Sequence, residues 1–139
     1  LHADVFTRTT ALHVHTALDV PRMQRAAAFA LGEHDFSAFM SAGCTIENTV
    51  RTVSRSEWMQ NGKYLYYNVS ANGFLYNMVR ILAGTLLEIG GGKLPEDAIT
   101  VALSSGLRSD AGATAPPHAL CLQRVQYEDF DTDEVLSRK

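Results

Sequence analysis

Two β-forming segments separated by an Asn-Gly dipeptide constrain the fold of this chain more than any other feature. Residues 49–60 and 64–72 are rich in Val, Thr, Trp and Tyr, and Asn61-Gly62 lies between them. Asn-Gly favours the two-residue turns of β-hairpins, because both residues accept a positive φ. In the second segment every other side chain from Leu65 onward is apolar or aromatic, as in a strand with one buried face. The sequence therefore predicts an antiparallel hairpin packed against a core.

Helical patterns lie on both sides of this hairpin. Residues 20–31 have an apolar face, preceded by Asp19 as a capping residue and followed by Gly32 as a stop. Residues 75–89 have apolar side chains at helical spacing and end in a run of three glycines. Residues 94–104 begin with Pro, Glu and Asp, which suit the first turn of a helix. Three helices are therefore predicted.

Weaker patterns complete the predicted fold. Residues 4–15 and 119–127 favour strands, and residues 34–43 favour a short helical turn and loop. The resulting order, β-α-β-β-α-(α)-β, is typical of an α+β, ferredoxin-like antiparallel sheet with helices on one face. We expect residues 1–127 to form this domain and residues 128–139 to form an acidic C-terminal tail.

Charge is unevenly distributed between these two parts. The chain of 139 residues has 12 Lys and Arg against 15 Asp and Glu, and five of those acids with two of the bases lie in residues 128–139. The remaining residues therefore balance at ten of each sign. A neutral domain does not by itself indicate a nucleic-acid binder, although a local basic patch is compatible with it. At 46% hydrophobic and 19% charged, the chain is neither disordered nor fibrous in composition.

The chain shows no feature of a secreted or membrane protein. Two cysteines are too few for a disulfide framework, and no signal peptide opens the sequence. The longest apolar stretch, residues 74–89, is interrupted by Arg80 and Glu88 and cannot span a bilayer. We therefore predict a cytoplasmic protein with no membrane partner. Because the chain begins with Leu1 rather than Met, we expect it to be part of a longer protein.

Arg80 is the most informative single residue, because it lies in the middle of the apolar helix. Small and polar residues share its stripe at helical intervals, namely Gly73, Asn77 and Gly84. Such a stripe lets another segment approach closely. A buried arginine needs an acidic partner, since breaking a buried ion pair costs roughly 3–5 kcal/mol. The alternative is a side chain that extends to solvent.

A metal site is not predicted. His13 and His15 are two residues apart, and His34 and Cys44 are the remaining ligand types that could join them. None of these residues has the paired spacing of a zinc site. We therefore expect no metal ion.

Four segments carry the remaining motifs and together cover nearly the whole chain apart from its ends. They are LDVPRMQRAAAFALGEHDFSAF (residues 18–39), RTV (51–53), NGFLYNMVRILAGTLLEIGGG (72–92) and AGATAPPHALCLQRVQY (111–127). The most specific motifs in them are the GxHDFxxF and GFLxxMVRxxxGxLxxxG patterns. These segments together resemble the C-terminal half of a TruA-family tRNA pseudouridine synthase. The resemblance implies one half of a two-domain fold with a cleft between two related α/β halves.

The resemblance also implies an activity and its partners. It implies isomerisation of uridines in the tRNA anticodon stem-loop, without metal or cofactor, by a homodimer. An aspartate of the N-terminal half attacks a uridine that is flipped out of the stem-loop. Arg80 would pair with that aspartate. Because this half bears no nucleophile, we predict that the chain alone is inactive.

Several further residues receive roles from the resemblance alone. Leu120 would support catalysis by packing near the target base, while Asn72 and Phe74 would wall the cleft. The residues implied to contact RNA are Arg51, Asn72, Gly73, Phe74 and Arg108.

The chain departs from the family pattern around its last motif. Leu107 precedes Arg108 where the family has Asp-Arg, and Ala119 precedes Leu120 where it has Gly-Leu. The run from Arg108 to Gly112 imitates the family's catalytic Arg-Thr-Asp-x-Gly, but lacks the Val-His-Ala that should follow. Asp110 is therefore interpreted as a loop acid rather than the nucleophile. Two alternatives stay open, a non-catalytic RNA-binding or dimerisation module and a scaffold of the same fold without an RNA role.

Overall fold

The computed structural model describes residues 5–127 and 130–133, which divide into two compact units. The first unit comprises residues 14–116 and contains the sheet and the helices. The second comprises the described parts of residues 2–13 and 117–139. The elements of the first unit are α1 (Val20–Ala28), β1 (Gly32–Asp35), a 3-10 helix (Ser37–Phe39), β2 (Val50–Asn61), β3 (Tyr64–Ala71), α2 (Met78–Gly90), α3 (Ala98–Ser105) and a second 3-10 helix (Arg108–Asp110).

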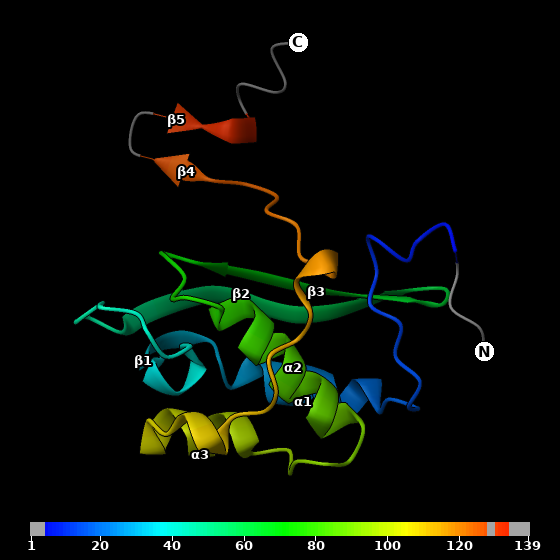
Figure 1. The fold of residues 1–139 in the computed structure, drawn as a ribbon, viewed down its shortest axis with the longest axis horizontal. Helices are drawn as coiled ribbons and strands as arrows, with labels where there is room; N and C mark the ends of the chain where they lie inside the picture. Colours follow the sequence, from blue (N-terminus) through cyan, green and yellow to red (C-terminus); the bar gives the residue numbers. More distant parts are fainter. Residues whose placement is uncertain (1–4, 128–129, 134–139) are drawn as a thin grey trace. The chain divides into compact units, whose positions relative to one another are not determined.

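The hairpin prediction is confirmed. Strands β2 and β3 pair antiparallel on either side of a loop formed by Gly62 and Lys63, with Asn61 opposite Tyr64. The turn is thus one residue later than predicted, and of the Asn61-Gly62 pair only Gly62, with φ of +60°, has a positive φ. The register is interrupted by a bulge between Val53 and Arg55. Strand β1 pairs antiparallel with the other side of β2, which gives the order β1-β2-β3 (Figure 1). Strand β1 was not predicted, because its sequence, Gly-Glu-His-Asp, has little β-forming character.

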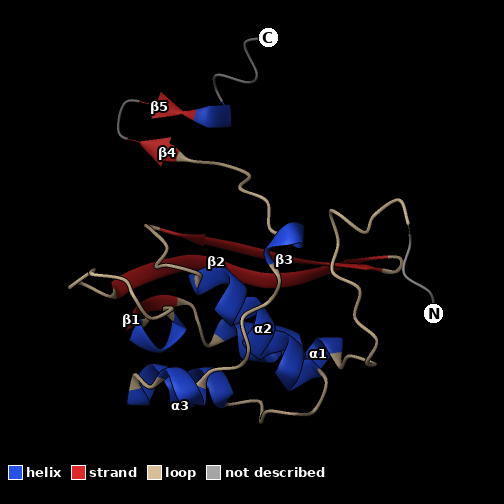
Figure 2. Ribbon diagram, viewed as in Figure 1, coloured by secondary structure: helices blue, strands red, loops and turns tan. Residues whose placement is uncertain are grey.

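The helices cover one face of this sheet (Figure 2). Helix α1 packs on β2, where Ser56 Oγ donates to the carbonyl oxygen of Ala27 at 2.7 Å. Ser56 Oγ is also 2.8 Å from the hydroxyl of Tyr67 on β3, and burial raises the pKa of Tyr67 to about 12. The predicted α+β class, with an antiparallel sheet and helices on one face, is confirmed. The largest fully buried side chains include Phe36, Phe39, Met23, Met78, Ile81, Leu82, Leu86, Ile89 and Ile99.

The helix limits differ in detail from the prediction. Asp19 caps α1 as expected, since its Oδ1 accepts from the backbone N–H of Arg22 at 3.0 Å. The helix nevertheless ends at Ala28, and Gly32, with φ of +95°, begins β1 instead of stopping α1. Helices α2 and α3 begin three and four residues later than predicted, and the glycine run ends α2 as expected.

The two terminal strand predictions were wrong in most of their length. In the described part of the first, residues 5–11 form turns and residues 12–15 have no regular structure, with Thr10 and Ala11 both donating to the carbonyl oxygen of Thr7. Residues 117–119 form a 3-10 helix that begins at the second of two successive prolines, which have no N–H to donate to a ladder. Among the described residues of the second unit, strand pairing joins only β4 (Gln126–Tyr127) and β5 (Phe130–Asp131). Of the predicted acidic tail, residues 128, 129 and 134–139 lie outside the described residues.

Within the described part of the chain, every helix is too short, or not apolar enough, to cross a membrane.

Candidate functional site

Arg80 lies in the first turn of α2 and is half buried. Its Nε donates to the carbonyl oxygen of Ala115 at 2.8 Å, and its Nη1 donates to Oδ1 of Asn77 at 2.8 Å. The backbone N–H of Ala115 returns a hydrogen bond to the carbonyl oxygen of Arg80 at 3.0 Å. Two neutral acceptors therefore hold two of the three guanidinium nitrogens.

The segment that approaches the stripe of α2 is residues 111–115. A Cβ added to Gly84 would overlap the carbonyl oxygen of Ala113, so only glycine admits the segment at this distance. The backbone N–H of Gly112 donates to Oγ1 of Thr85 at 2.8 Å, and Thr85 donates to the carbonyl oxygen of Ile81. The expectation of a close approach along this stripe is confirmed, and the approaching atoms belong to the backbone.

The third guanidinium nitrogen of Arg80, Nη2, has no protein partner among the described residues. Nη2 makes no hydrogen bond or ion pair there, and it is not among their buried unpartnered atoms, so it faces solvent. The acidic partner expected for a buried arginine is thus replaced, within this part of the chain, by Asn77 and Ala115. An arginine held in this way can offer the N–H groups of Nη2 to an anionic group, because guanidinium N–H donors match carboxylate and phosphate oxygens.

The two acids considered in the sequence are placed differently. Glu88 lies two turns along α2 from Arg80, about 12 Å at 1.5 Å per residue, and its Oε1 accepts a long 3.4 Å hydrogen bond from Ala113. Asp110 ends the 3-10 helix Arg108–Asp110 and lines a small cavity with Leu94 and Pro95. Neither acid forms an ion pair with Arg80 in the described residues.

The junction between the hairpin and α2 brings three other predicted residues together. Asn72 closes it, since its Oδ1 accepts from the backbone N–H of Thr52 at 2.9 Å and its own N–H donates back to Thr52. A Cβ at Gly73 would lie 3.4 Å from Nε of Arg51, so the side chain of Arg51 lies against Gly73. Phe74 follows with 41% of its surface exposed. This junction presents a cation and an aromatic ring beside the start of α2.

Arg108 and Leu120 occupy other surroundings. Arg108 donates to the carbonyl oxygen of Gly112 at 2.8 Å and to Oγ1 of Thr114 at 3.2 Å, so it braces the segment that holds Arg80. Leu120 belongs to the second unit, after the 3-10 helix Pro117–Ala119, and is 53% exposed.

Asn77 has a role that the sequence did not assign. It was noticed only as a small polar member of the stripe, yet it contacts Arg80 directly and donates from Nδ2 to Ser41 Oγ at 3.0 Å. The available signal was its position three residues before an arginine at the start of a helix, a spacing at which side chains meet.

Other arginines are already paired with acids. Arg25 forms a two-point ion pair with Glu96, which raises the pKa of Arg25 and lowers that of Glu96 through the hydrogen bonds between them. Arg55 pairs with Glu57, and Arg124 pairs with Asp133. Surface pairs of this kind stabilise little, but they reduce the positive charge offered to a polyanion.

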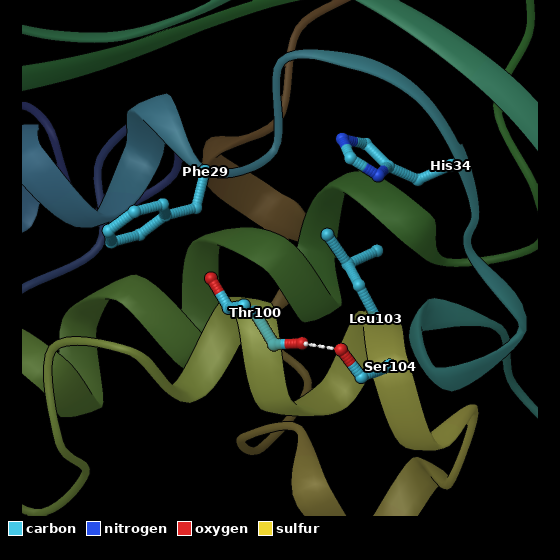
Figure 3. Close-up of a pocket in the computed structure, with 5 residues that line it drawn as sticks. All are labelled: Phe29, His34, Thr100, Leu103 and Ser104. Carbon is cyan, nitrogen blue, oxygen red and sulfur yellow. Dashed lines mark hydrogen bonds between the residues drawn. The ribbon is translucent and has the colours of Figure 1, made fainter.

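A cavity of about 330 Å³ lies between the end of α1, β1 and α3 (Figure 3). Its lining residues include neither Arg80 nor the residues that contact it. Its walls are Phe29, His34, Leu103, and the Thr100–Ser104 pair, in which Ser104 Oγ donates to the carbonyl oxygen of Thr100 at 2.9 Å. Among the described residues, no three His, Cys, Asp or Glu side chains are grouped closely enough to hold a metal ion.

These contacts define an α+β domain in which two neutral acceptors hold a half-buried arginine at the start of α2. A family model described as "tRNA pseudouridine synthase" matches residues 26–128. The chain is 47% identical over 124 residues to a protein named tRNA pseudouridine synthase A from Moorella thermoacetica, an alignment covering 89% of this chain and 50% of that protein. It is 48% identical to a protein of the same name from Shouchella clausii, over 89% of this chain and 48% of that protein.

The chain therefore belongs to the tRNA pseudouridine synthase family, as the sequence patterns predicted. It spans about half the length of the curated relatives it matches.

Proposed function

We propose that this chain is the C-terminal part of a tRNA pseudouridine synthase that isomerises uridines in the anticodon stem-loop. The nucleophilic aspartate comes from a part of the protein outside this chain. The printed names of the relatives support the tRNA substrate, and the half-length alignments support a second part. We further propose that the complete protein is a cytoplasmic homodimer that binds RNA.

The observation that carries this proposal is that Nη2 of Arg80 has no partner among the described residues. Its Nε and Nη1 are fixed by Ala115 and Asn77, while Nη2 has no partner in the described residues. A carboxylate arriving from outside would complete a charge-assisted pair with a guanidinium that is already oriented. Prior orientation matters because a reacting group held near its productive geometry needs no further ordering during the reaction.

The reaction itself requires neither an oxidant nor a reductant. Conversion of uridine to pseudouridine breaks the bond from the ribose carbon to the base nitrogen and forms one to a base carbon. That carbon loses a proton and the nitrogen gains one, so the product is an isomer. In this scheme Arg80 keeps the nucleophilic aspartate ionised and aimed at the ribose, since a nearby cation favours a charged carboxylate.

The hairpin junction fits a contact with RNA beside this centre. Arg51 would supply positive charge for a phosphate, and the exposed ring of Phe74 would stack on an unpaired base. Gly73 has no side chain, so the RNA could approach the backbone closely between Arg51 and Phe74. Leu120 would pack near the target base, and Arg108 would reach RNA only beyond its contacts with Gly112 and Thr114.

The test uses the full-length gene product and this chain in parallel, each incubated with unmodified tRNA and assayed for pseudouridine. The expected result is product from the full-length protein alone. Arg80→Ala in that protein should abolish turnover while the protein stays folded. Arg25→Ala, which removes an equally charged but exposed residue, should leave turnover unchanged.

Three results would count against the proposal. Normal turnover by Arg80→Ala would remove Arg80 from the site. Product made by this chain alone and lost in Asp110→Asn would make Asp110 the nucleophile. Binding of tRNA by the full-length protein without any product would favour the non-catalytic module instead.

A further inference from the structure

Asn77 joins Arg80 to a third segment of the chain. Its Oδ1 accepts from Nη1 of Arg80 at 2.8 Å, and its Nδ2 donates to Ser41 Oγ at 3.0 Å. Ser41 is held in turn, because its backbone N–H donates to the carbonyl oxygen of Tyr76 at 3.1 Å. Both ends of the amide are therefore used, and rotating it would break both hydrogen bonds.

The backbone of Asn77 is also unusual. Its φ of +60° makes it the one non-glycine residue with positive φ in the described ranges 5–127 and 130–133. Asparagine tolerates this conformation better than most residues, but it still carries strain. Asn77 occupies the N-cap of α2, yet its side chain forms no capping hydrogen bond with the helix backbone. The side chain of Asn77 therefore bonds to Arg80 and Ser41 instead of forming the stabilising hydrogen bond of an ordinary N-cap asparagine.

The chemistry of an amide suits this contact in one particular respect. A carboxylate in the same place would accept from Arg80 more strongly, because hydrogen bonds between ionised groups are roughly twice as strong as neutral ones. It would also satisfy the positive charge of Arg80 from within the domain. An amide orients the guanidinium and leaves its charge available to an anion from outside.

We propose that Asn77 is a positioning residue for Arg80, which fixes the guanidinium through a neutral acceptor and so reserves its charge for the external carboxylate. This inference rests on the proposed function, because it assigns Arg80 the same partner.

The experiment compares Asn77→Gly and Asn77→Asp in the full-length protein, with Asn61→Asp as the control. Glycine keeps the positive φ and removes the amide. Aspartate keeps the shape and favours a helix N-cap, but adds a carboxylate beside Arg80. Asn61→Asp adds the same charge to an exposed side chain at the last residue of β2, away from the contacts of Arg80. Turnover, KM for tRNA and melting temperature are measured for each protein.

The expected result separates stability from activity. Asn77→Gly should lower kcat about tenfold with little change in KM, which is the effect of losing one hydrogen bond to a charged group. Asn77→Asp should lower kcat further, although its melting temperature should equal or exceed that of Asn77→Gly. Asn61→Asp should match the wild type in all three measurements.

A purely structural role for Asn77 predicts the opposite order, with Asn77→Asp more active than Asn77→Gly, and that order would overturn the inference. Wild-type kcat in both Asn77 variants would also overturn it. Arg80→Ala, measured alongside, distinguishes the two proposals. If Arg80→Ala is inactive while both Asn77 variants are normal, the proposed function stands and the positioning role fails. If Arg80→Ala is fully active, the proposed function fails.

Discussion

Gly84→Ala provides a direct test of how residues 111–115 are docked on α2. In an isolated helix this change would be favourable by about 1 kcal/mol, because alanine loses less backbone entropy than glycine. Here the new methyl group would overlap the backbone of Ala113, and a backbone atom cannot move aside as a flexible side chain can. The segment would have to lift from the helix.

The cost of that movement can be worked from the hydrogen bonds that hold the segment. Lifting it weakens the two bonds between Ala115 and Arg80 and the bond from Gly112 to Thr85. At about 1 kcal/mol for each bond, the loss is about 3 kcal/mol. Subtracting the gain of about 1 kcal/mol in helix propensity leaves a net destabilisation of about 2 kcal/mol.

Urea unfolding followed by circular dichroism measures the loss in free energy of unfolding caused by Gly84→Ala. In a thermal melt, the melting temperature should fall by several degrees for a domain of this size. Gly91→Ala is the matched control at the end of the same helix, where φ is −80° and the nearest atom to a new Cβ is 3.4 Å away. Its effect should stay within about 0.5 kcal/mol. A Gly84→Ala protein as stable as the wild type would refute the described docking of residues 111–115.

Three further predictions concern the rest of the domain. Tyr67→Phe should lower the free energy of unfolding by about 1 kcal/mol, because it removes the partner of buried Ser56, as urea titration would show; no change would mean that this hydrogen bond contributes nothing. Gly62→Ala should cost about 1 kcal/mol in the same assay, since φ of +60° strains a residue with a Cβ, and a neutral result would indicate a different turn. The hydrogen bond from Thr49 lowers the pKa of Asp35. The wild type should therefore be more stable than Asp35→Asn at neutral pH, and this difference should disappear as the pH falls below about 4. A difference in stability that persists in acid would contradict this origin.

The predictable parts of the fold were those determined by local sequence. The Asp19 cap and the glycine run after α2 each act through their own backbone or nearest neighbours, and each was found as predicted. The hairpin was also found, but its loop consists of Gly62 and Lys63, and Asn61 is the last residue of β2. Strand β1 depends instead on a long-range partner, because Gly32–Asp35 is extended by pairing with β2. The opposite error arose at residues 119–127, where β-forming side chains lack a strand partner over most of their length.

The candidate site divides in the same way. Arg80 could be singled out because a charge within an apolar helical pattern is visible in the sequence. The close approach at Gly84 was also predicted, since a glycine on the same stripe leaves room for another segment. The identity of that segment was not predictable, because Ala113 and Ala115 contribute only backbone atoms. The contact of Asn77 with Ser41 was not predictable either, because it depends on where Ser41 lies in space.

The reciprocal contact between Ala115 and Arg80 has a consequence for mutational surveys of this family. Both hydrogen bonds use the main chain of residue 115, so its side chain can change without altering either of them. A scan that replaces one side chain at a time would therefore score this position as tolerant. Only a change to the main chain, such as a proline that lacks the N–H or a one-residue deletion, would reveal that the arginine depends on it.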